Sequence, residues 1–270
     1  MQYGAMNFPI RPVLSELEDF AHLGFDYIEI AMDAPEGHHR KLRDNQRAIR
    51  SALKRYEMGV VCHLPTFVYT ADLAEDIRQA SLGEMIRSLE TAAALGAEKA
   101  VLHPSMVSGL GALVLEEVRA YADNSLAALV AAARPLNLRL CLENIFPKYQ
   151  IGYDPAEFEI WFARHPDLKL TLDTGHGNID APGTRRILQF VRMFGDRIGH
   201  VHVSDNRGKG DDHLPIGKGR IDFSTVFSAL AEAGYDGTVT LEVFTEDRGT
   251  LKRSRDRLAD LIAKVRSARS

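Results

Sequence analysis

The residues of this chain that could do chemistry are histidines and carboxylates, and one glycine-rich stretch concentrates them. His202 comes near the end of an apolar run, and Asp211 and His213 follow in a loop punctuated by glycines. Imidazole nitrogens together with carboxylate oxygens are typical ligands of a divalent metal ion. Surface loops also carry aspartate and histidine for solvation alone, so this stretch by itself leaves both interpretations open.

The same residue types recur at the ends of other apolar runs along the chain. A single histidine at such a position is more often a hydrogen-bonded core residue than a ligand. Recurrence over six consecutive runs is hard to produce by chance, and it predicts a shared metal site. The candidate ligands are His63, His103, Glu143, Asp173, His176, His202, Asp211, His213 and Glu242.

Four of these candidates are carboxylates, namely Glu143, Asp173, Asp211 and Glu242. In one pocket they would repel each other, and their pKa values would rise unless cations were present. Mixed nitrogen and oxygen ligation favours zinc, manganese, cobalt or iron over calcium. We therefore expect a divalent metal as the cofactor.

Eight apolar runs alternate with eight stretches of helical periodicity, and these elements must position the candidate ligands. The predicted strands cover residues 2–6, 27–31, 59–63, 99–103, 139–143, 169–173, 199–204 and 238–244. The predicted helices cover residues 12–23, 41–56, 75–95, 112–133, 155–164, 184–194, 223–233 and 251–266. Gly24, Gly96 and Gly234 follow three of these helices, which is typical of a helix C-terminus.

The strands show no polar alternation, which predicts a parallel sheet that helices cover. Eight such units predict an α/β fold with a single (β/α)8 TIM barrel over residues 1–270. In such barrels the carboxyl ends of the strands meet at one mouth, where the active site lies. The nine candidates should therefore surround one cavity. His200 should lie one layer deeper, as a core residue that could orient His202.

Size and composition exclude several other classes of protein. The 270 residues are 45% hydrophobic, with no apolar run of about 18 residues, so we expect a cytoplasmic protein without a membrane partner. The net charge of −4 gives no general attraction to nucleic acid. Strand alternation places Cys62 on the face opposite His63 but Cys141 on the same face as Glu143. The two cysteines should therefore stay unpaired.

Several side chains beside the candidate ligands could contact a substrate. Arg207, Lys209 and Lys218, together with His176, would suit an anionic substrate such as a sugar phosphate, although loop solvation explains the cations equally well. A basic cluster at residues 38–43 has the same two interpretations, a phosphate clamp or a solvated helix start. A further group, which could wall a sugar or pack the barrel rim, consists of Phe67, Tyr69, Phe146 and Tyr149.

Five short motifs resemble those of the xylose isomerase-like TIM-barrel superfamily. They read LEN at residues 142–144, LDTGH at 172–176, HVSD at 202–205, DDHLPIGKG at 211–219 and LEV at 241–243. This superfamily contains sugar and sugar-phosphate isomerases and epimerases, together with the endonuclease IV class of DNA repair enzymes in AP endonuclease family 2. The similarity runs from the third predicted strand to the eighth, and more loosely over the first two.

The resemblance implies different metal sites in the two branches. In the isomerase and epimerase branch, one divalent metal is held at Glu143, Asp173, His202 and Glu242, and the two glutamates also move the substrate proton. In the endonuclease IV branch, all nine candidates hold three zinc ions. The expected cofactor is therefore zinc, manganese or cobalt, with one to three ions. The chain lacks the glycine-rich His-Val-Ser signature of those nucleases after its first strand.

We therefore predict a divalent-metal sugar or sugar-phosphate isomerase or epimerase. Glu143 and Glu242 would exchange the substrate proton through a metal-stabilised enediolate. The first alternative is an endonuclease IV-like phosphodiesterase acting on abasic-site DNA, and the second is a non-catalytic metal- or sugar-binding barrel. The expected partner is a small sugar or sugar phosphate, and nucleic acid is the partner only under the first alternative. Homo-oligomers are common among barrels of this kind, so a homo-oligomer is one of the expected states.

Overall fold

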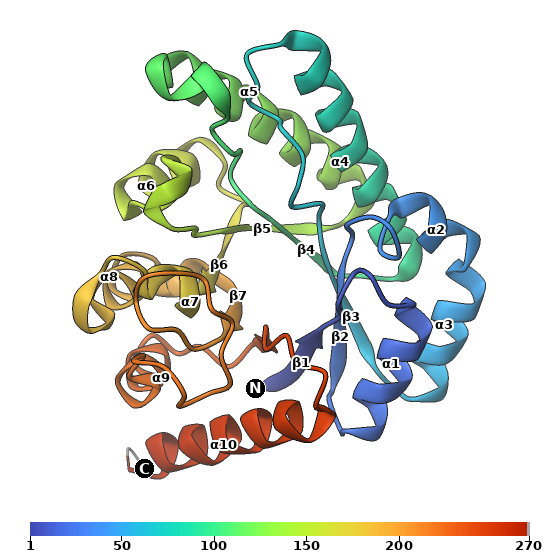
Figure 1. Cartoon of the computed structure of the whole chain (residues 1–270), viewed down its shortest axis with the longest axis vertical. Coiled ribbons are helices and arrows are strands. Elements are labelled where there is room, and N and C mark those ends of the chain that lie inside the picture. The colour runs from blue at the N-terminus through green and yellow to red at the C-terminus, as the bar shows by residue number, and fades with distance from the viewer. Residues whose placement is uncertain (269–270) are drawn as a thin grey trace.

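Eight parallel strands close into one barrel, in the order in which they occur in the chain. The computed structural model describes residues 1–268, and helices surround the strands (Figure 1). The (β/α)8 barrel predicted from the sequence is therefore confirmed. The strands are β1 (Gln2–Met6), β2 (Tyr27–Ala31), β3 (Gly59–His63), β4 (Lys99–Leu102), β5 (Arg139–Glu143), β6 (Lys169–Asp173), β7 (Ile198–Val203) and β8 (Thr238–Leu241).

The helices follow the strands along the chain, with short 3-10 turns between some of them. The α-helices are α1 (Val13–His22), α2 (His39–Asp44), α3 (Gln46–Arg55), α4 (Glu75–Leu95), α5 (Leu115–Ala133), α6 (Pro155–Arg164), α7 (Thr174–Asn178), α8 (Arg185–Phe194), α9 (Phe223–Glu232) and α10 (Arg248–Ser267). The 3-10 turns are η1 (Gly109–Leu113), η2 (Arg134–Leu136), η3 (Pro147–Tyr149), η4 (Pro182–Thr184) and η5 (Gly195–Arg197). Over residues 1–268, no helix is both long and apolar enough to cross a bilayer.

Besides shifts of one to three residues at other element ends, the elements differ from the sequence prediction in three notable places. The single helix expected at residues 41–56 is two helices, because Asn45 has φ −98° and ψ 6° and interrupts the helical backbone. The last strand ends at Leu241, three residues before the predicted end at 244. The short helix α7 was not predicted; it begins directly after β6, where the Asp173 side chain accepts a hydrogen bond from the His176 backbone N–H.

The predicted helix ends are confirmed by the backbone of three glycines. Gly24, Gly96 and Gly234 have φ values of 78°, 96° and 75°. Glycine adopts this left-handed region without the steric cost that a Cβ atom would bring. Each turn therefore ends a helix and directs the chain into the next strand.

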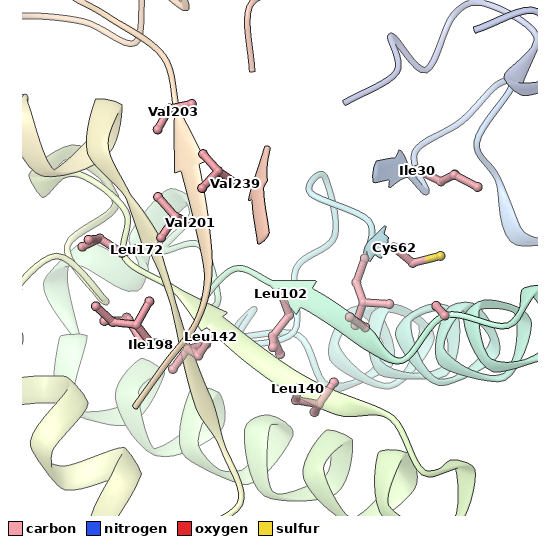
Figure 2. Packing of buried hydrophobic residues seen from close by; sticks show 14 of the residues in the cluster. Ile30, Cys62, Leu102, Leu140, Leu142, Leu172, Ile198, Val201, Val203 and Val239 are labelled. Carbon is pink, nitrogen blue, oxygen red and sulfur yellow. The ribbon is translucent and has the colours of Figure 1, made fainter. Parts of the chain in front are cut away.

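The barrel has two apolar layers. One lies between the strands and the surrounding helices, and the other lies inside the barrel. Figure 2 shows Leu102, Leu140 and Leu142 of the outer layer on the neighbouring strands β4 and β5. The inner layer is small and consists of Tyr27, Val61, Val101 and Cys141. Cys62 belongs to the outer layer, and both cysteines are buried and unpaired, as strand alternation predicts.

Tyr27 fits inside the barrel because the facing residue on β1 is Gly4. A Cβ atom at Gly4 would lie 2.2 Å from the Tyr27 ring, which is far inside van der Waals contact. The Tyr27 ring belongs to the inner apolar layer, and the buried side chains of Glu143, Asp173 and His202 lie at the carboxyl ends of the strands.

Candidate metal centre

The centre of the site is a carboxylate and histidine group at the ends of three neighbouring strands. Glu143 on β5, Asp173 on β6 and His202 on β7 are buried, and one ligand atom from each lies within 4.8 Å of the others. Glu242, the residue after β8, places Oε1 at 2.9 Å from His202 Nδ1. Glu143 Oε2 lies 3.3 Å from the same nitrogen. His202 Nδ1 therefore lies close to the carboxylates of both Glu143 and Glu242.

A second group of ligand atoms shares Glu143 with the first. His63 at the end of β3 and His103 just after β4 place their Nε2 atoms 3.2 Å and 3.3 Å from Glu143 Oε2. Ligand atoms of these three residues also lie within 4.8 Å of one another. Glu143 therefore belongs to both groups and could contribute to an ion held in either of them.

The remaining three candidates lie on the opposite side of Glu143. His176 in α7 places Nδ1 at 3.1 Å from Glu143 Oε1, and its Nε2 lies 3.3 Å from Asp211 Oδ2. His213 Nε2 lies 3.0 Å from the same Asp211 oxygen, and its Nδ1 is 3.0 Å from the Glu242 carbonyl oxygen. The structure thus brings all nine candidate ligands together at one end of the barrel.

The loop between β7 and α9, which carries Asp211 and His213, is organised by Asp205. This buried carboxylate accepts four backbone hydrogen bonds, from the N–H groups of Asn206, Gly217, Gly219 and Ile221. Gly219 is required here, because a Cβ atom would lie 2.3 Å from the Asp205 carboxylate and from a neighbouring carbonyl. The Asp205 carboxylate therefore fixes both ends of the loop to one point.

The donor atoms of the site fit a metal ion. Buried polar atoms normally have hydrogen-bond partners. Among the described residues, ten buried side-chain N or O atoms have none, and five of the ten belong to candidate ligands. These five are His103 Nδ1, Glu143 Oε1, Asp173 Oδ2, His202 Nδ1 and Asp211 Oδ1. Of these atoms, Glu143 Oε1, Asp173 Oδ2 and His202 Nδ1 face other candidate ligands and would be satisfied by a bound cation.

The pKa shifts of the candidate ligands also favour a bound cation. Burial lowers the pKa of His63, but the hydrogen bond and charge of Glu143 outweigh burial and raise the pKa to about 9. Burial raises the pKa of Asp173 to about 7. Burial also opposes ionisation of Glu143, yet His202 and His103 hold its pKa well below the usual value. Protons on the imidazoles and metal ions therefore compete to neutralise the same carboxylates.

A cavity of about 250 Å³ opens above the ligand group. His63, His103, His176, Asp211, His213 and Glu242 lie in its wall, while Glu143, Asp173 and His202 lie buried beneath them. The wall also contains five aromatic residues, namely Phe8, Phe67, Phe146, Tyr149 and Phe244. Tyr69, which the sequence grouped with them, is not part of the wall.

The cavity wall contains no lysine or arginine among the residues that the structure describes. The cations expected beside the substrate lie elsewhere on the loop after β7. Arg207 pairs with Asp212, Lys209 pairs with Asp180, and Lys218 is exposed. Of the four predicted substrate contacts, only His176 faces the cavity.

Sequence reasoning missed Glu29, a fully buried carboxylate in the middle of β2. Its Oε1 accepts a hydrogen bond from His202 Nε2 at 3.0 Å, and its Oε2 accepts one from His200 Nε2 at 2.8 Å. The signal was present, because Glu29 is the only charged residue in the run YIEIA. His200 lies one layer below His202 as predicted. The two ring centroids are 4.9 Å apart, and both rings also form a hydrogen bond with Glu29.

The chain belongs to the xylose isomerase-like TIM-barrel family, whose family model matches residues 17–266. An uncharacterized protein of Methanocaldococcus jannaschii is 30% identical over 90% of this chain and 83% of its own length. An L-ribulose 3-epimerase of a Methylomonas species is 27% identical over 84% of this chain and 77% of its own length. The crystal structure of a D-tagatose 3-epimerase-like protein superposes with a TM-score of 0.88 at 25% identity, and each chain is fully covered.

Proposed function

We propose that this protein is a divalent-metal-dependent epimerase or isomerase of a small ketose. The observation that carries the proposal is the buried group of Glu143, Asp173, His202 and Glu242 beneath an aromatic-walled cavity. Family membership and the sugar 3-epimerases among the relatives support the same reaction class.

The four buried residues would hold one divalent ion. A metal held there acts as a Lewis acid that polarises a substrate carbonyl. Because Asp173 is buried and caps α7 through the His176 backbone N–H, it would serve as a fixed ligand rather than a proton carrier. Glu143 and Glu242 come from strands that are not neighbours, so their carboxylates reach a small substrate from different sides.

Glu143 and Glu242 are the proposed proton carriers. One of them, as the carboxylate, takes the proton from the carbon next to the carbonyl. The C–H electron pair then forms the new C=C bond, and the carbonyl oxygen takes the negative charge of the enediolate. The other, as the carboxylic acid, returns a proton to the opposite face of the same carbon. Its own charge becomes negative, and solvent exchange resets the pair.

The cavity wall favours an uncharged sugar over a sugar phosphate. A bound phosphate is normally held by arginine, lysine or several backbone N–H groups. The described wall offers none of these cations, whereas Phe67, Phe146 and Tyr149 present apolar faces that suit the C–H face of a sugar. The substrate is therefore an unphosphorylated ketose or a ketose with an apolar substituent.

Further ions would occupy the shell around the central group. His63 and His103 would share Glu143 with the central ion, and His176, Asp211 and His213 would hold a third. Zinc, cobalt or manganese fit this nitrogen and oxygen set, with one to three ions. Elemental analysis of wild type and of Asp211→Asn/His213→Ala gives the number, because the double variant should lose an ion without emptying the centre.

The same candidate ligands would suit a phosphodiesterase, but the charge of the surface around them does not suit the binding of DNA. Duplex DNA binding requires lysines and arginines that neutralise several phosphates. In the basic cluster at residues 38–43, every basic side chain except Arg40 already contacts a carboxylate. Lys41 contacts Glu36, Arg43 contacts Glu90, and His38 and His39 contact Glu84. These pairs leave little free positive charge at the barrel mouth.

Solvent exchange tests the proposal directly. The metal-loaded protein, incubated with a panel of ketoses and ketose phosphates in deuterium oxide, should introduce deuterium at one carbon of an unphosphorylated ketose. An abasic-site oligonucleotide should stay intact under the same conditions. Metal-dependent nicking without any sugar exchange would favour the phosphodiesterase. Metal binding with neither reaction would favour a non-catalytic barrel.

A further inference from the structure

Glu29 lies at the centre of a hydrogen-bonded network beneath the metal centre. Its side chain is fully buried, and no lysine or arginine within residues 1–268 forms an ion pair with it. Three donors reach the carboxylate. His202 Nε2 lies 3.0 Å from Oε1, and His200 Nε2 and Thr240 Oγ1 lie 2.8 Å and 2.5 Å from Oε2.

The lower part of the network sets the direction of these hydrogen bonds. Lys99 Nζ can only donate, and it lies 2.9 Å from Thr238 Oγ1. The Thr238 hydroxyl therefore directs its own proton to His200 Nδ1, which lies 2.6 Å away. His200 then carries its ring proton on Nε2, which faces Glu29.

In the upper part of the network, Thr240 and His202 donate to Glu29. Tyr27 Oη lies 2.8 Å from Thr240 Oγ1, so the tyrosine donates to Thr240 and the Thr240 proton goes to Glu29. His202 Nε2 has Glu29 as its hydrogen-bond partner and must carry a proton to make that bond. When His202 is neutral, its other nitrogen, Nδ1, therefore has a free lone pair. That atom is buried, has no hydrogen-bond partner, and faces Glu143 and Glu242.

We propose that Glu29 is a positioning residue, which fixes the tautomer and ring orientation of His202 so that Nδ1 binds the metal. A carboxylate that accepts the second N–H of a metal-binding histidine holds the ring in place and makes the ligand nitrogen more basic. A buried carboxylate with no lysine or arginine partner is costly for folding. The three hydrogen-bond donors offset the cost of burying the Glu29 carboxylate, and its contact with His202 gives it a role in the metal centre. This inference rests on the metal centre proposed above.

The test compares zinc affinity in Glu29→Gln and in wild type. Glutamine keeps the size of the side chain but loses the charge, and it directs an N–H₂ group toward one of the three donors. Chelator competition should show zinc binding about 10 to 100 times weaker in Glu29→Gln. Tyr27→Phe is the matched control, because it removes a hydroxyl that reaches Thr240 and leaves the contact between Glu29 and His202 intact. Its zinc affinity should stay close to that of wild type.

A second measurement needs no variant. Nitrogen-15 NMR of the zinc-loaded wild type should show His202 with a slowly exchanging proton on Nε2 and with zinc on Nδ1. Zinc on Nε2, or equal affinity in wild type and Glu29→Gln, would overturn the inference. Both readouts measure binding and not turnover. Zinc-loaded protein with the expected NMR signature but without sugar exchange would therefore contradict the proposed reaction and leave the role of Glu29 supported.

Discussion

Glu143 contacts more of the candidate ligands than any other residue discussed here. Its carboxylate lies within 3.3 Å of His63, His103, His176 and His202. Glu242, in contrast, faces His202 and the more distant His213 ring. Both glutamates are proposed proton carriers, but Glu143 also joins the separate histidine groups. The two residues should therefore differ in their effect on metal content.

We expect Glu143→Gln and Glu242→Gln both to abolish sugar exchange, because each removes a base and an anionic ligand. Glu143→Gln should lose more metal, because more ligand atoms surround it. Glu246→Gln is the control, since that side chain is exposed at 95% on the same face. Metal content by elemental analysis and deuterium exchange by NMR check both points. Full exchange in Glu242→Gln would remove it from the proposed mechanism.

The histidines of the site make the stability of the metal-free protein depend on pH. Burial lowers the pKa of His213, but the hydrogen bond to Asp211 and the charge of Glu242 outweigh burial and raise it to about 9. The ordinary value is about 6.5. A raised pKa means that the folded state binds the proton more tightly than the unfolded state. The resulting stabilisation is complete below about pH 6.5 and is lost as the pH rises through 9.

The unfolding temperature of the metal-free protein should therefore fall between about pH 6.5 and about pH 9.5. In His213→Asn the fall should be smaller, because one histidine with a raised pKa is removed. A fall should remain, because the pKa of His63 is also raised to about 9. Differential scanning calorimetry in the presence of a chelator measures both slopes. An unfolding temperature that rises over this range, or an equal slope in both proteins, would contradict the assignment.

The loop between β7 and α9 depends on a single carboxylate. Asp205 Oδ2 accepts hydrogen bonds from Gly217 and Gly219, and Oδ1 accepts them from Asn206 and Ile221. Both carboxylate oxygens are needed, since each serves two donors. The loop in turn carries Asp211 and His213 over the cavity, so its conformation determines where these ligands lie.

We expect Asp205→Asn to lower the free energy of unfolding by about 3 kcal/mol, because the amide N–H₂ would face two N–H donors whichever way it turned. Loss of the ions nearest Asp211 should accompany the loss of stability. Asp212→Asn is the matched control on the same loop, where the side chain is part-exposed and the amide oxygen can still accept from the Arg207 N–H. Denaturant unfolding measures both variants. Equal stability of Asp205→Asn and wild type would show that the loop is held by other contacts.

The barrel as a whole brings ligands together from strands β3 to β8 and the loop after β7. Metal binding should therefore stabilise the entire fold, because the unfolded chain does not present these residues together. At a free metal concentration 100 times the dissociation constant, the gain is about 2.7 kcal/mol. For a chain of this size, that gain raises the unfolding temperature by roughly 5 to 10 °C.

Thermal unfolding should thus shift downward when a chelator removes the metal and return when zinc, cobalt or manganese is added back. Magnesium, which prefers oxygen ligands, should restore less at the same concentration. The variant Glu143→Gln is the control, because it should show little response to any metal. A wild-type unfolding temperature that is the same with and without metal would contradict a metal centre in this barrel.

The sequence by itself determined the strand order, the barrel and the nine residues at its mouth. Eight alternating units have few ways to bury both faces of a parallel sheet, and closure places every strand end on one side. Some helix ends were also predictable from the sequence, because Gly24, Gly96 and Gly234 mark them. These features follow from periodicity and residue type, which do not require knowledge of distant contacts.

Only the tertiary structure decided what lies beside those residues. Glu29 is 171 residues from His200 and 173 from His202 in the chain, so no spacing rule could pair them. The loop cations Arg207 and Lys209 follow candidate ligands closely in sequence, yet their side chains turn to Asp212 and Asp180 instead of the cavity. Side-chain direction in a loop depends on partners from elsewhere in the chain. For that reason, the positions of the candidate ligands were predictable, whereas their supporting contacts and the absence of lysine and arginine from the described cavity wall were not.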